Sequence, residues 1–389
     1  TAAAYISYAF TEVAAIFPIT PSSPMAEYVD EWAAKGKKNI FDQVVDVVEL
    51  QSEGGASGTV HGSLAAGALT TTYTASQGLL LMIPNLYKVA GELLPGVFHV
   101  SARTLSVHGL SIFGDHSDVM ACRQIGTAML ASSNPQEVMD LGAVAHLSAI
   151  KGSLPFIHFF DGFRTSHEIQ KIDALDYEDL KPLVDMEAVN RFRKRALNPE
   201  RPTTRGTTQN PDIFFQQREA ANPYYTSLPQ TVEHYMGEIN RITGRNYQLF
   251  NYYGDENAEY LIIAMGSVCD TIAETVDYLR GQGKSVGLLN VHLYRPFSVE
   301  HFMSAIPQSV KKIAVLDRTK EPGAVGEPLY QDVRNAFDQT GRDAVIVGGR
   351  YGLASKDTTP AQIVAVFENL MQETPRTGFT IGIEDDVTG

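Results

Sequence analysis

Apolar residues recur along the first 165 residues at two alternating spacings. Some segments have the 3–4-residue spacing of an amphipathic helix, and others are short, continuously apolar runs typical of buried strands. The predicted helices are residues 2–13, 25–36 and 134–152. The predicted strands are residues 14–19, 41–50, 92–103 and 154–162. Such alternation favours a parallel sheet wrapped by helices, so we predict an α/β fold.

The pattern changes over residues 170–245, which are polar, rich in Pro and Arg, and poorly periodic. We expect this stretch to be a long surface excursion followed by a connector. A second alternation begins near residue 246, with strands over 259–266, 284–294, 311–318 and 344–349. Its helices are predicted over 270–283, 299–306, 326–337 and 360–371. We therefore predict two domains, residues 1–245 and residues 246–389.

Composition limits the classes of function. The net charge of −14 argues against a nucleic-acid binder or a protein of anionic membrane surfaces, because both need a basic face. No apolar run reaches the ~18 to 20 residues of a membrane span. The two cysteines, Cys122 and Cys269, form no CxxC or Cys/His array, which argues against a disulfide framework, an iron–sulfur cluster or a structural zinc site in this chain. Two lone thiols fit a reducing compartment, and we expect a cytoplasmic protein.

The stretch "FPITPSSPMAE" (17–27) places three prolines and several hydroxyl groups between a predicted strand and a predicted helix. Ser23 followed by Pro24 fits a helix N-cap with proline at the first helical position. The stretch is either simply a well-formed turn or part of a ligand crevice, since loops at the carboxyl ends of parallel strands line such crevices. In the second interpretation, the Thr20 hydroxyl touches what binds beside the positive end of a helix.

Glu53 opens a run of Gly, Ala and Ser over residues 53–68 that we expect to pack closely as a helix. One interpretation is structural, because a glutamate in the first helical turn is favoured by the helix dipole. The other is functional: burial among small apolar residues raises a carboxyl pKa, while the helix end lowers it. Should burial prevail, Glu53 is a proton donor at neutral pH. The sequence leaves both interpretations open.

Arg103 follows the predicted strand over 92–103, where a guanidinium can bind a carboxylate through two parallel hydrogen bonds. The alternative is a structural ion pair with Asp115 or Asp118. The "GDHSD" segment that contains these aspartates lacks metal-ligand spacing, so we expect loop hydrogen bonds there rather than a metal site.

Long blocks of the sequence carry a family resemblance. They are residues 17–27, 60–103, 108–120, 158–172, 315–333 and 349–360. Together they resemble the N-terminal part of single-chain pyruvate:ferredoxin oxidoreductases, and the resemblance extends over essentially the whole chain. It implies a pyrimidine-binding thiamine pyrophosphate domain followed by a domain like the C-terminal domain of transketolases.

The resemblance also implies a reaction and a set of site residues. In the family, pyruvate is decarboxylated and oxidised to acetyl-CoA with coenzyme A as acceptor, and electrons leave through [4Fe-4S] clusters to ferredoxin or flavodoxin. The family's threonine of the "PITPSSP" turn falls on Thr20 and contacts pyruvate, and its strand-end arginine falls on Arg103 and pairs with the pyruvate carboxylate. Its glutamate falls on Glu53 and hydrogen-bonds the aminopyrimidine ring of the cofactor. Gly54 stands where many relatives have alanine, a small departure.

Parts of the family machinery are missing from this sequence. There is no GDG…N segment for a Mg²⁺–pyrophosphate site, and no cysteine set for a cluster. We therefore expect a piece of a longer protein that is inactive alone, and a homodimer whose partner completes the site. The rival hypotheses are a pyruvate:NADP oxidoreductase, the substrate-binding subunit of a multi-chain 2-oxoacid:ferredoxin oxidoreductase, and, from a different class, a catalytically silent scaffold domain.

Overall fold

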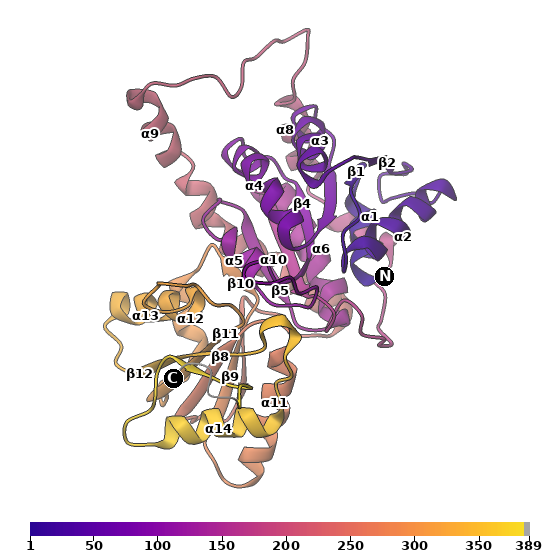
Figure 1. The fold of residues 1–389 in the computed structure, drawn as a ribbon. Coiled ribbons are helices and arrows are strands. Elements are labelled where there is room, and N and C mark those ends of the chain that lie inside the picture. Colours follow the sequence, from indigo (N-terminus) through magenta and orange to yellow (C-terminus); the bar gives the residue numbers. More distant parts are fainter. Residues whose placement is uncertain (385–389) are drawn as a thin grey trace.

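The computed structural model describes residues 1–384, which form two helix-covered sheets, one above the other in Figure 1. The first sheet has the strand order β10-β5-β6-β4-β3-β1-β2. Its strands are β1 (Val13–Ile16), β2 (Asp46–Glu49), β3 (Thr70–Thr74), β4 (Val97–Ala102), β5 (Ala128–Ser132), β6 (Phe156–Asp161) and β10 (Leu293–Arg295). Strands β1 to β6 pair in parallel, whereas β10 is antiparallel to β5. The predicted parallel sheet is confirmed, with one added strand from the second half of the chain.

The second sheet has the order β13-β12-β11-β8-β9-β7. Its strands are β7 (Phe250–Gly254), β8 (Tyr260–Ala264), β9 (Val286–Val291), β11 (Lys312–Asp317), β12 (Val345–Arg350) and β13 (Phe379–Thr380). The edge strand β7 is antiparallel to β9, and the other pairs are parallel. The predicted strands of the second half form one sheet except for the end of the strand over 284–294, which is β10 of the first sheet. Strand β7 is an addition whose partly exposed side chains give no apolar run.

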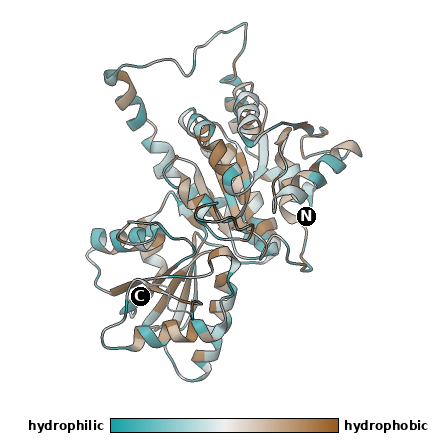
Figure 2. Cartoon of the chain, viewed as in Figure 1, coloured by the Kyte–Doolittle hydropathy of each residue, from teal (hydrophilic) through white to brown (hydrophobic). Residues whose placement is uncertain are grey.

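Helices lie on both faces of the first sheet. The helices that precede the second sheet in the sequence are α1 (Ala2–Phe10), α2 (Ser23–Ala34), α3 (Glu53–Ala65), α4 (Ser76–Gly91), α5 (Ser117–Ala121), α6 (Pro135–Gly152), α7 (Tyr177–Leu180), the 3₁₀ helix η1 (Lys181–Leu183), α8 (Met186–Lys194), α9 (Pro211–Glu219) and α10 (Asn222–Thr243). Helices α3 and α4 pack on each other, with α3 against β1 and β3; α1 packs on α6, and α10 on the outside of α6. Figure 2 shows the resulting pattern, with apolar strands inside and polar helix faces outside.

The second sheet is covered by α11 (Val268–Gly281), α12 (Val299–Ala305), α13 (Pro328–Thr340) and α14 (Pro360–Met371), with a short 3₁₀ turn, η2 (Leu353–Ser355). Helix α11 packs beside α14 on the β8–β9 side of the sheet. Within residues 1–384, no helix combines the length and the apolar character that crossing a bilayer requires.

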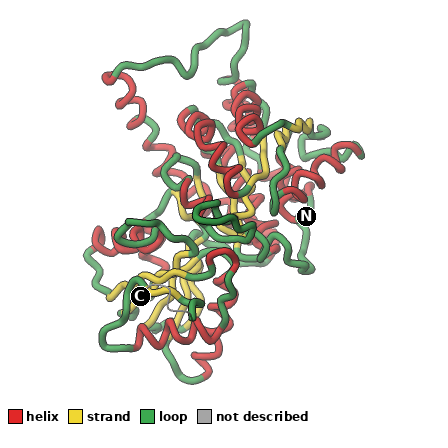
Figure 3. Tube along the Cα trace, in the orientation of Figure 1, coloured by secondary structure: helices red, strands yellow, loops and turns green. Residues whose placement is uncertain are grey.

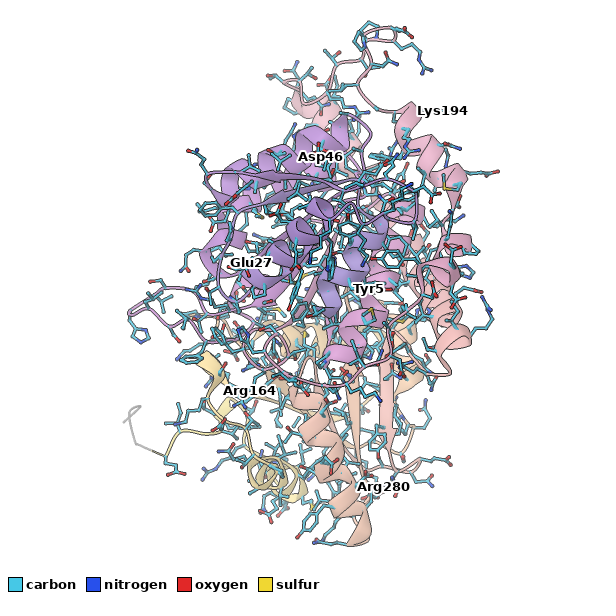
Figure 4. The ribbon with its side chains drawn as sticks, turned by 90° about the vertical axis from the view of Figure 1, so that its right-hand side faces the viewer. Tyr5, Glu27, Asp46, Arg164, Lys194 and Arg280 are labelled. Carbon is cyan, nitrogen blue, oxygen red and sulfur yellow. The ribbon has the colours of Figure 1, made fainter. Side chains whose placement is uncertain are left out.

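The expected excursion contains more regular structure than its polar composition indicated. Residues 195–210 do run as a loop that begins after Lys194 and leads to α9, a helix in which no residue is buried (Figures 3 and 4). The following helix α10, however, buries Leu228, Val232 and Met236. Their spacing is helical, but Pro229 and the many polar neighbours hid it from the sequence pattern.

The two sheets meet at a buried ion pair. Asp161, the last residue of β6, accepts hydrogen bonds from His116 Nε2 at 2.6 Å and the Ser267 N–H at 2.8 Å, and its Oδ2 lies 2.9 Å from Arg318 Nη1. Burial acts to raise the pKa of Asp161, but Arg318 and then His116 outweigh it and hold that pKa below its ordinary value. Since Ser267 and Arg318 follow β8 and β11, this carboxylate fixes the carboxyl edges of both sheets to each other.

Three imidazoles lie inside the first domain, between the sheet and α6. His99 Nδ1 is 3.0 Å from His158 Nδ1, and His99 Nε2 is 3.0 Å from His146 Nε2. The row ends at Ser132, whose hydroxyl lies 2.8 Å from His158 Nε2. Burial lowers the pKa of His146 and of His158 to about 3 and places that of His99 well below its ordinary value. All three are therefore neutral near pH 7, a state that lets imidazoles hydrogen-bond to one another.

Candidate functional site

The three residues singled out from the sequence all follow strands of the first sheet at its carboxyl edge. Thr20 lies in the loop after β1, Glu53 begins α3 just after β2, and Arg103 follows β4 directly. Strand β1 lies between β2 and β3 in the sheet. The connection after β1 therefore runs to β2 on one side, whereas the connection after β3 runs to β4 on the other side. Such a reversal opens a crevice at the carboxyl ends of the strands, where ligands of open α/β sheets bind.

The turn after β1 is held by a buried serine. Helix α2 begins at Ser23 and Pro24 is its second residue, so the predicted cap at Ser23 is wrong by one position. Ser22 occupies the cap position, but its hydroxyl makes no capping bond. It donates instead to the Thr74 carbonyl at 2.6 Å. The Ser22 hydroxyl does not cap the helix because the Thr74 carbonyl is a competing partner, and this bond fixes the turn to β3. Thr20 is exposed in the same turn.

Arg103 contacts this turn from the end of β4. Its Nη1 donates to the Thr20 carbonyl oxygen at 2.8 Å, although the two residues are 83 positions apart. The side chain is buried, and its Nε has no hydrogen-bond partner. Burial lowers the pKa of Arg103, while the charge of Asp118 acts in the opposite direction.

The structure also decides the alternative proposed for Arg103. Among residues 1–384, no carboxylate forms an ion pair with its guanidinium. Asp118 accepts the backbone N–H of Arg103 instead, at 3.0 Å, and Asp115 accepts the N–H of Ser117. The "GDHSD" segment thus makes loop hydrogen bonds as predicted, and the guanidinium remains available for an anion.

Glu53 is buried at the start of α3, with an exposed fraction of 9%. The cap of this helix is Ser52, whose hydroxyl accepts the Gly55 N–H at 3.0 Å. No hydrogen bond from residues 1–384 reaches the Glu53 carboxylate. Its side chain lies against Gly78 in the first turn of α4, where a Cβ atom would stand 2.8 Å from Glu53 Cγ and 2.8 Å from Thr74 Oγ1.

The Thr74 hydroxyl is itself a buried group without a hydrogen-bond partner. Buried polar groups in native structures are nearly always paired, so an unpaired hydroxyl next to an unpaired carboxylate calls for a ligand with donors and acceptors of its own. Because Gly78 has no side chain, the Glu53 side chain and the Thr74 hydroxyl can both lie close to the backbone of α4 there. A carboxyl group and a hydroxyl offer the donor and acceptor chemistry that a nitrogen-bearing ring needs, whereas among the described residues no cluster of His, Cys, Asp or Glu is arranged to hold a metal ion.

Sequence reasoning missed Thr74, Gly78 and Ser76. Ser76 opens α4 with a φ of 54°, a left-handed conformation that is costly for a residue other than glycine. Strain of this kind is invisible in a sequence. For Thr74, the only sequence clue was its place at the end of the polar run "TTTYT", which did not resemble a strand.

Family models match most of the chain. Residues 5–237 match "Pyruvate flavodoxin/ferredoxin oxidoreductase, thiamine diP-bdg", and residues 258–363 match "Pyruvate:ferredoxin oxidoreductase core domain II".

Curated relatives align over the full chain. The pyruvate-flavodoxin oxidoreductase of Enterobacter agglomerans is 66% identical and the pyruvate:ferredoxin oxidoreductase of Moorella thermoacetica 63% identical, each over 100% of this chain and 33% of the relative. The pyruvate dehydrogenase [NADP(+)] of Cryptosporidium parvum is 52% identical, with 20% of its length covered. The chain thus spans about a third of the first two relatives.

Two solved structures share the fold. The 2-oxoglutarate:ferredoxin oxidoreductase from Magnetococcus marinus, solved with 2-oxoglutarate, coenzyme A and succinyl-CoA, superposes with a TM-score of 0.65 at 18% identity over 95% of this chain and 64% of that one. A split-gene transketolase in an inactive tetramer superposes with a TM-score of 0.53 at 9% identity over 96% of both chains.

Proposed function

Because the chain belongs to the pyruvate flavodoxin/ferredoxin oxidoreductase family, we propose that it carries the pyrimidine-binding half of a thiamine diphosphate site together with the contacts for the substrate carboxylate. The whole protein then oxidises and decarboxylates pyruvate with coenzyme A to acetyl-CoA and CO₂. Electrons leave to ferredoxin or flavodoxin through iron–sulfur clusters outside this chain. The NADP-type relative leaves a second acceptor open, and only the sequence of the remaining protein distinguishes the two.

The observation that carries the proposal is Glu53. Its carboxyl group is buried at the carboxyl edge of the sheet, without a donor from residues 1–384, beside the bare backbone of Gly78. Thiamine diphosphate, when bound, supplies the nucleophilic carbon that attacks the carbonyl of a 2-oxoacid. Glu53 would hold a proton at its carboxyl oxygen and share it with a nitrogen of the pyrimidine ring. Thr74 Oγ1 would offer a second polar contact.

Arg103 and Thr20 are proposed to bind pyruvate. The guanidinium is buried, and within residues 1–384 it has no carboxylate partner and its Nε has no acceptor, so the substrate carboxylate would satisfy it through charge-assisted hydrogen bonds. The Thr20 carbonyl holds the guanidinium in place, and the exposed Thr20 hydroxyl lies in the same turn. Arg103 thus orients the substrate, and the stiff proline-rich turn maintains that orientation.

Other parts of the family's machinery are proposals for the full protein. The Mg²⁺ site, the [4Fe-4S] clusters and the diphosphate contacts would come from the other two-thirds of a protein of the relatives' length. We further propose a homodimer in which the partner contributes to the site. The Glu53 carboxylate supports this arrangement, because it is buried and no donor from residues 1–384 reaches it, so that its partner can come from a second chain.

Calorimetry on the full-length protein tests the proposed function. Thiamine diphosphate with Mg²⁺ should bind with measurable heat, pyruvate should then be consumed only when coenzyme A and an electron acceptor are present, and E53Q should weaken turnover. A catalytically silent scaffold would give no heat with the cofactor and no consumption of pyruvate, and either result would refute the proposal.

A further inference from the structure

One buried carboxylate connects the two halves of the candidate site. Asp118, in α5, is fully buried. Its Oδ2 accepts the N–H of Ser76 at 2.7 Å and the N–H of Arg103 at 3.0 Å. Its Oδ1 accepts the N–H of Val119 at 2.7 Å. No side-chain cation pairs with it among the described residues, so its charge rests on backbone donors alone.

The two amides held by Oδ2 belong to different segments of the site. Ser76 begins α4, and two residues later Gly78 packs against Glu53. Arg103 ends β4 and carries the guanidinium across to the Thr20 turn. A shift of either amide would move one half of the site relative to the other, because a single oxygen atom fixes both.

The geometry at Ser76 shows that this contact is maintained against strain. The residue has a φ of 54°, and its hydroxyl also donates to the Thr104 carbonyl. Left-handed backbone at a residue other than glycine is strained and persists only where several surrounding contacts hold it in place. Asp118 Oδ2 is one such constraint in this turn, because it accepts the Ser76 N–H at 2.7 Å, and a carboxylate in its ionised form is a stronger acceptor than a neutral carbonyl.

We propose that Asp118 is a positioning residue, which sets the Arg103 guanidinium at its working distance from the Glu53 half of the site by holding the main chain of Ser76 and Arg103 on one oxygen. The proposal rests on the proposed function, because it assigns Arg103 to the substrate. It gives one residue of the "GDHSD" segment, Asp118, a role in orienting the substrate. Burial raises the pKa of Asp118 to about 7, and the backbone N–H groups of Arg103 and Ser76 act in the opposite direction, as donors to this carboxyl group do.

The test is a double-mutant cycle in the full-length enzyme. D118N keeps one oxygen for the N–H groups of Ser76 and Arg103 but puts an NH₂ group where Oδ1 accepted the Val119 N–H. The side chain therefore holds the main chain less firmly. The KM for pyruvate should rise about tenfold while kcat changes by less than about threefold. R103A alone should raise the KM by about 50-fold or more. The double variant should resemble R103A, because Asp118 acts through Arg103.

A matched control is available in the same loop. Asp115 is also a buried carboxylate, but its oxygens accept the N–H groups of Ser117 at 2.9 Å and Ala354 at 3.4 Å. D115N should therefore leave the pyruvate KM within about twofold of the wild type. An equal rise of KM in D115N and D118N would show general loosening of the loop and overturn the proposal.

The remaining outcomes are also decisive. If the increases in KM caused by D118N and R103A multiply in the double variant, or if D118N leaves the KM unchanged, the positioning role is overturned while the proposed function stays intact. An unchanged KM in R103A itself would refute the substrate contact, and the Asp118 proposal with it. Should D118N not fold, D118E retains the charge and replaces it in the cycle; failure of both to fold, judged by thermal melting, would show a purely structural carboxylate and overturn the proposal.

Discussion

Replacing Gly78 with alanine perturbs the Glu53 environment by a single atom. The added Cβ would stand 2.8 Å from Glu53 Cγ, 2.9 Å from Glu53 Oε1 and 2.8 Å from Thr74 Oγ1. Carbon atoms rest at about 3.5–4.0 Å from one another, so the Glu53 side chain must move by about 1 Å. The carboxylate can yield because it has no hydrogen bond within residues 1–384 to break.

The expected cost to stability is small and the expected cost to activity is large. Alanine gains about 0.5–1 kcal/mol over glycine inside a helix, whereas the crowding costs about 1–3 kcal/mol, which leaves a net destabilisation of about 1 kcal/mol. A displacement of about 1 Å in a group that must meet a ring nitrogen lowers turnover by about 10²-fold. Stability is measured by urea denaturation, and turnover by pyruvate-dependent reduction of an artificial electron acceptor in the full-length protein.

A control of the same chemistry lies in α10. Gly237 is inside a helix and an added Cβ there meets nothing within 4 Å. G237A should therefore stabilise the protein by about 0.5–1 kcal/mol and leave turnover unchanged. Wild-type turnover in G78A would refute the reasoning, because it would show that the contact between Glu53 and Gly78 has no part in catalysis. Equal losses in both variants would point to altered helix stability instead.

Three further predictions concern single side chains. E53Q should lower turnover by about 10² or more, because an amide cannot give up a proton to the ring; near-normal turnover in a steady-state assay would contradict the assignment. R103K should raise the pyruvate KM by about tenfold with little change in kcat, since one ammonium replaces a two-pronged donor; an unchanged KM would argue against the contact. H158N should make unfolding less sensitive to acid. Burial holds the pKa of His158 at about 3, against 6.5 in the unfolded chain, so its contribution to stability is present above pH 6.5 and is lost as the pH falls. Urea denaturation should show H158N losing about 1.4 kcal/mol less than the wild type between about pH 7.5 and 5.5, and an identical loss in the two proteins would refute this.

The parts of the fold that the sequence predicted are those in which one face of each element is uniformly apolar. The strand over 154–162 and the helix over 134–152 are of this kind, and both are confirmed. Strand β3 was missed because its residues Thr70–Thr74 are buried on both faces yet mostly polar, so they form no apolar run. The predicted strand over 284–294 is divided into β9 and β10, and β10 joins the other sheet. The sequence did not show this division, because a periodic pattern carries no information about which sheet a strand enters.

The residues of the candidate site can also be divided into those that the sequence predicted and those that it did not. The sequence placed Glu53 and Arg103 at strand ends, and the structure places them at the same edge of one sheet. It gave no indication of Asp118 as the link between Ser76 and Arg103, because the three are separated along the chain by 42 and 15 residues. Contacts between backbone amides and a distant carboxylate depend on how loops close, and they leave no pattern in local composition.

The distribution of unsatisfied polar groups gives the candidate site its physical basis. Six buried side-chain atoms in the described part of the chain lack a hydrogen-bond partner, and four of them belong to Thr72, Thr74, Ser101 and Arg103, on β3, on β4 or directly after β4. Each such atom costs about 1–3 kcal/mol, so chance burial would be expected to scatter them rather than gather them on two neighbouring strands. Apolar residues of similar size would fold this edge of the sheet at lower cost. These unpaired polar groups lie near the Glu53 carboxylate, which also has no donor within residues 1–384. Such an arrangement is expected of a binding site whose ligand, and whose remaining residues from other parts of the protein, are still to be added.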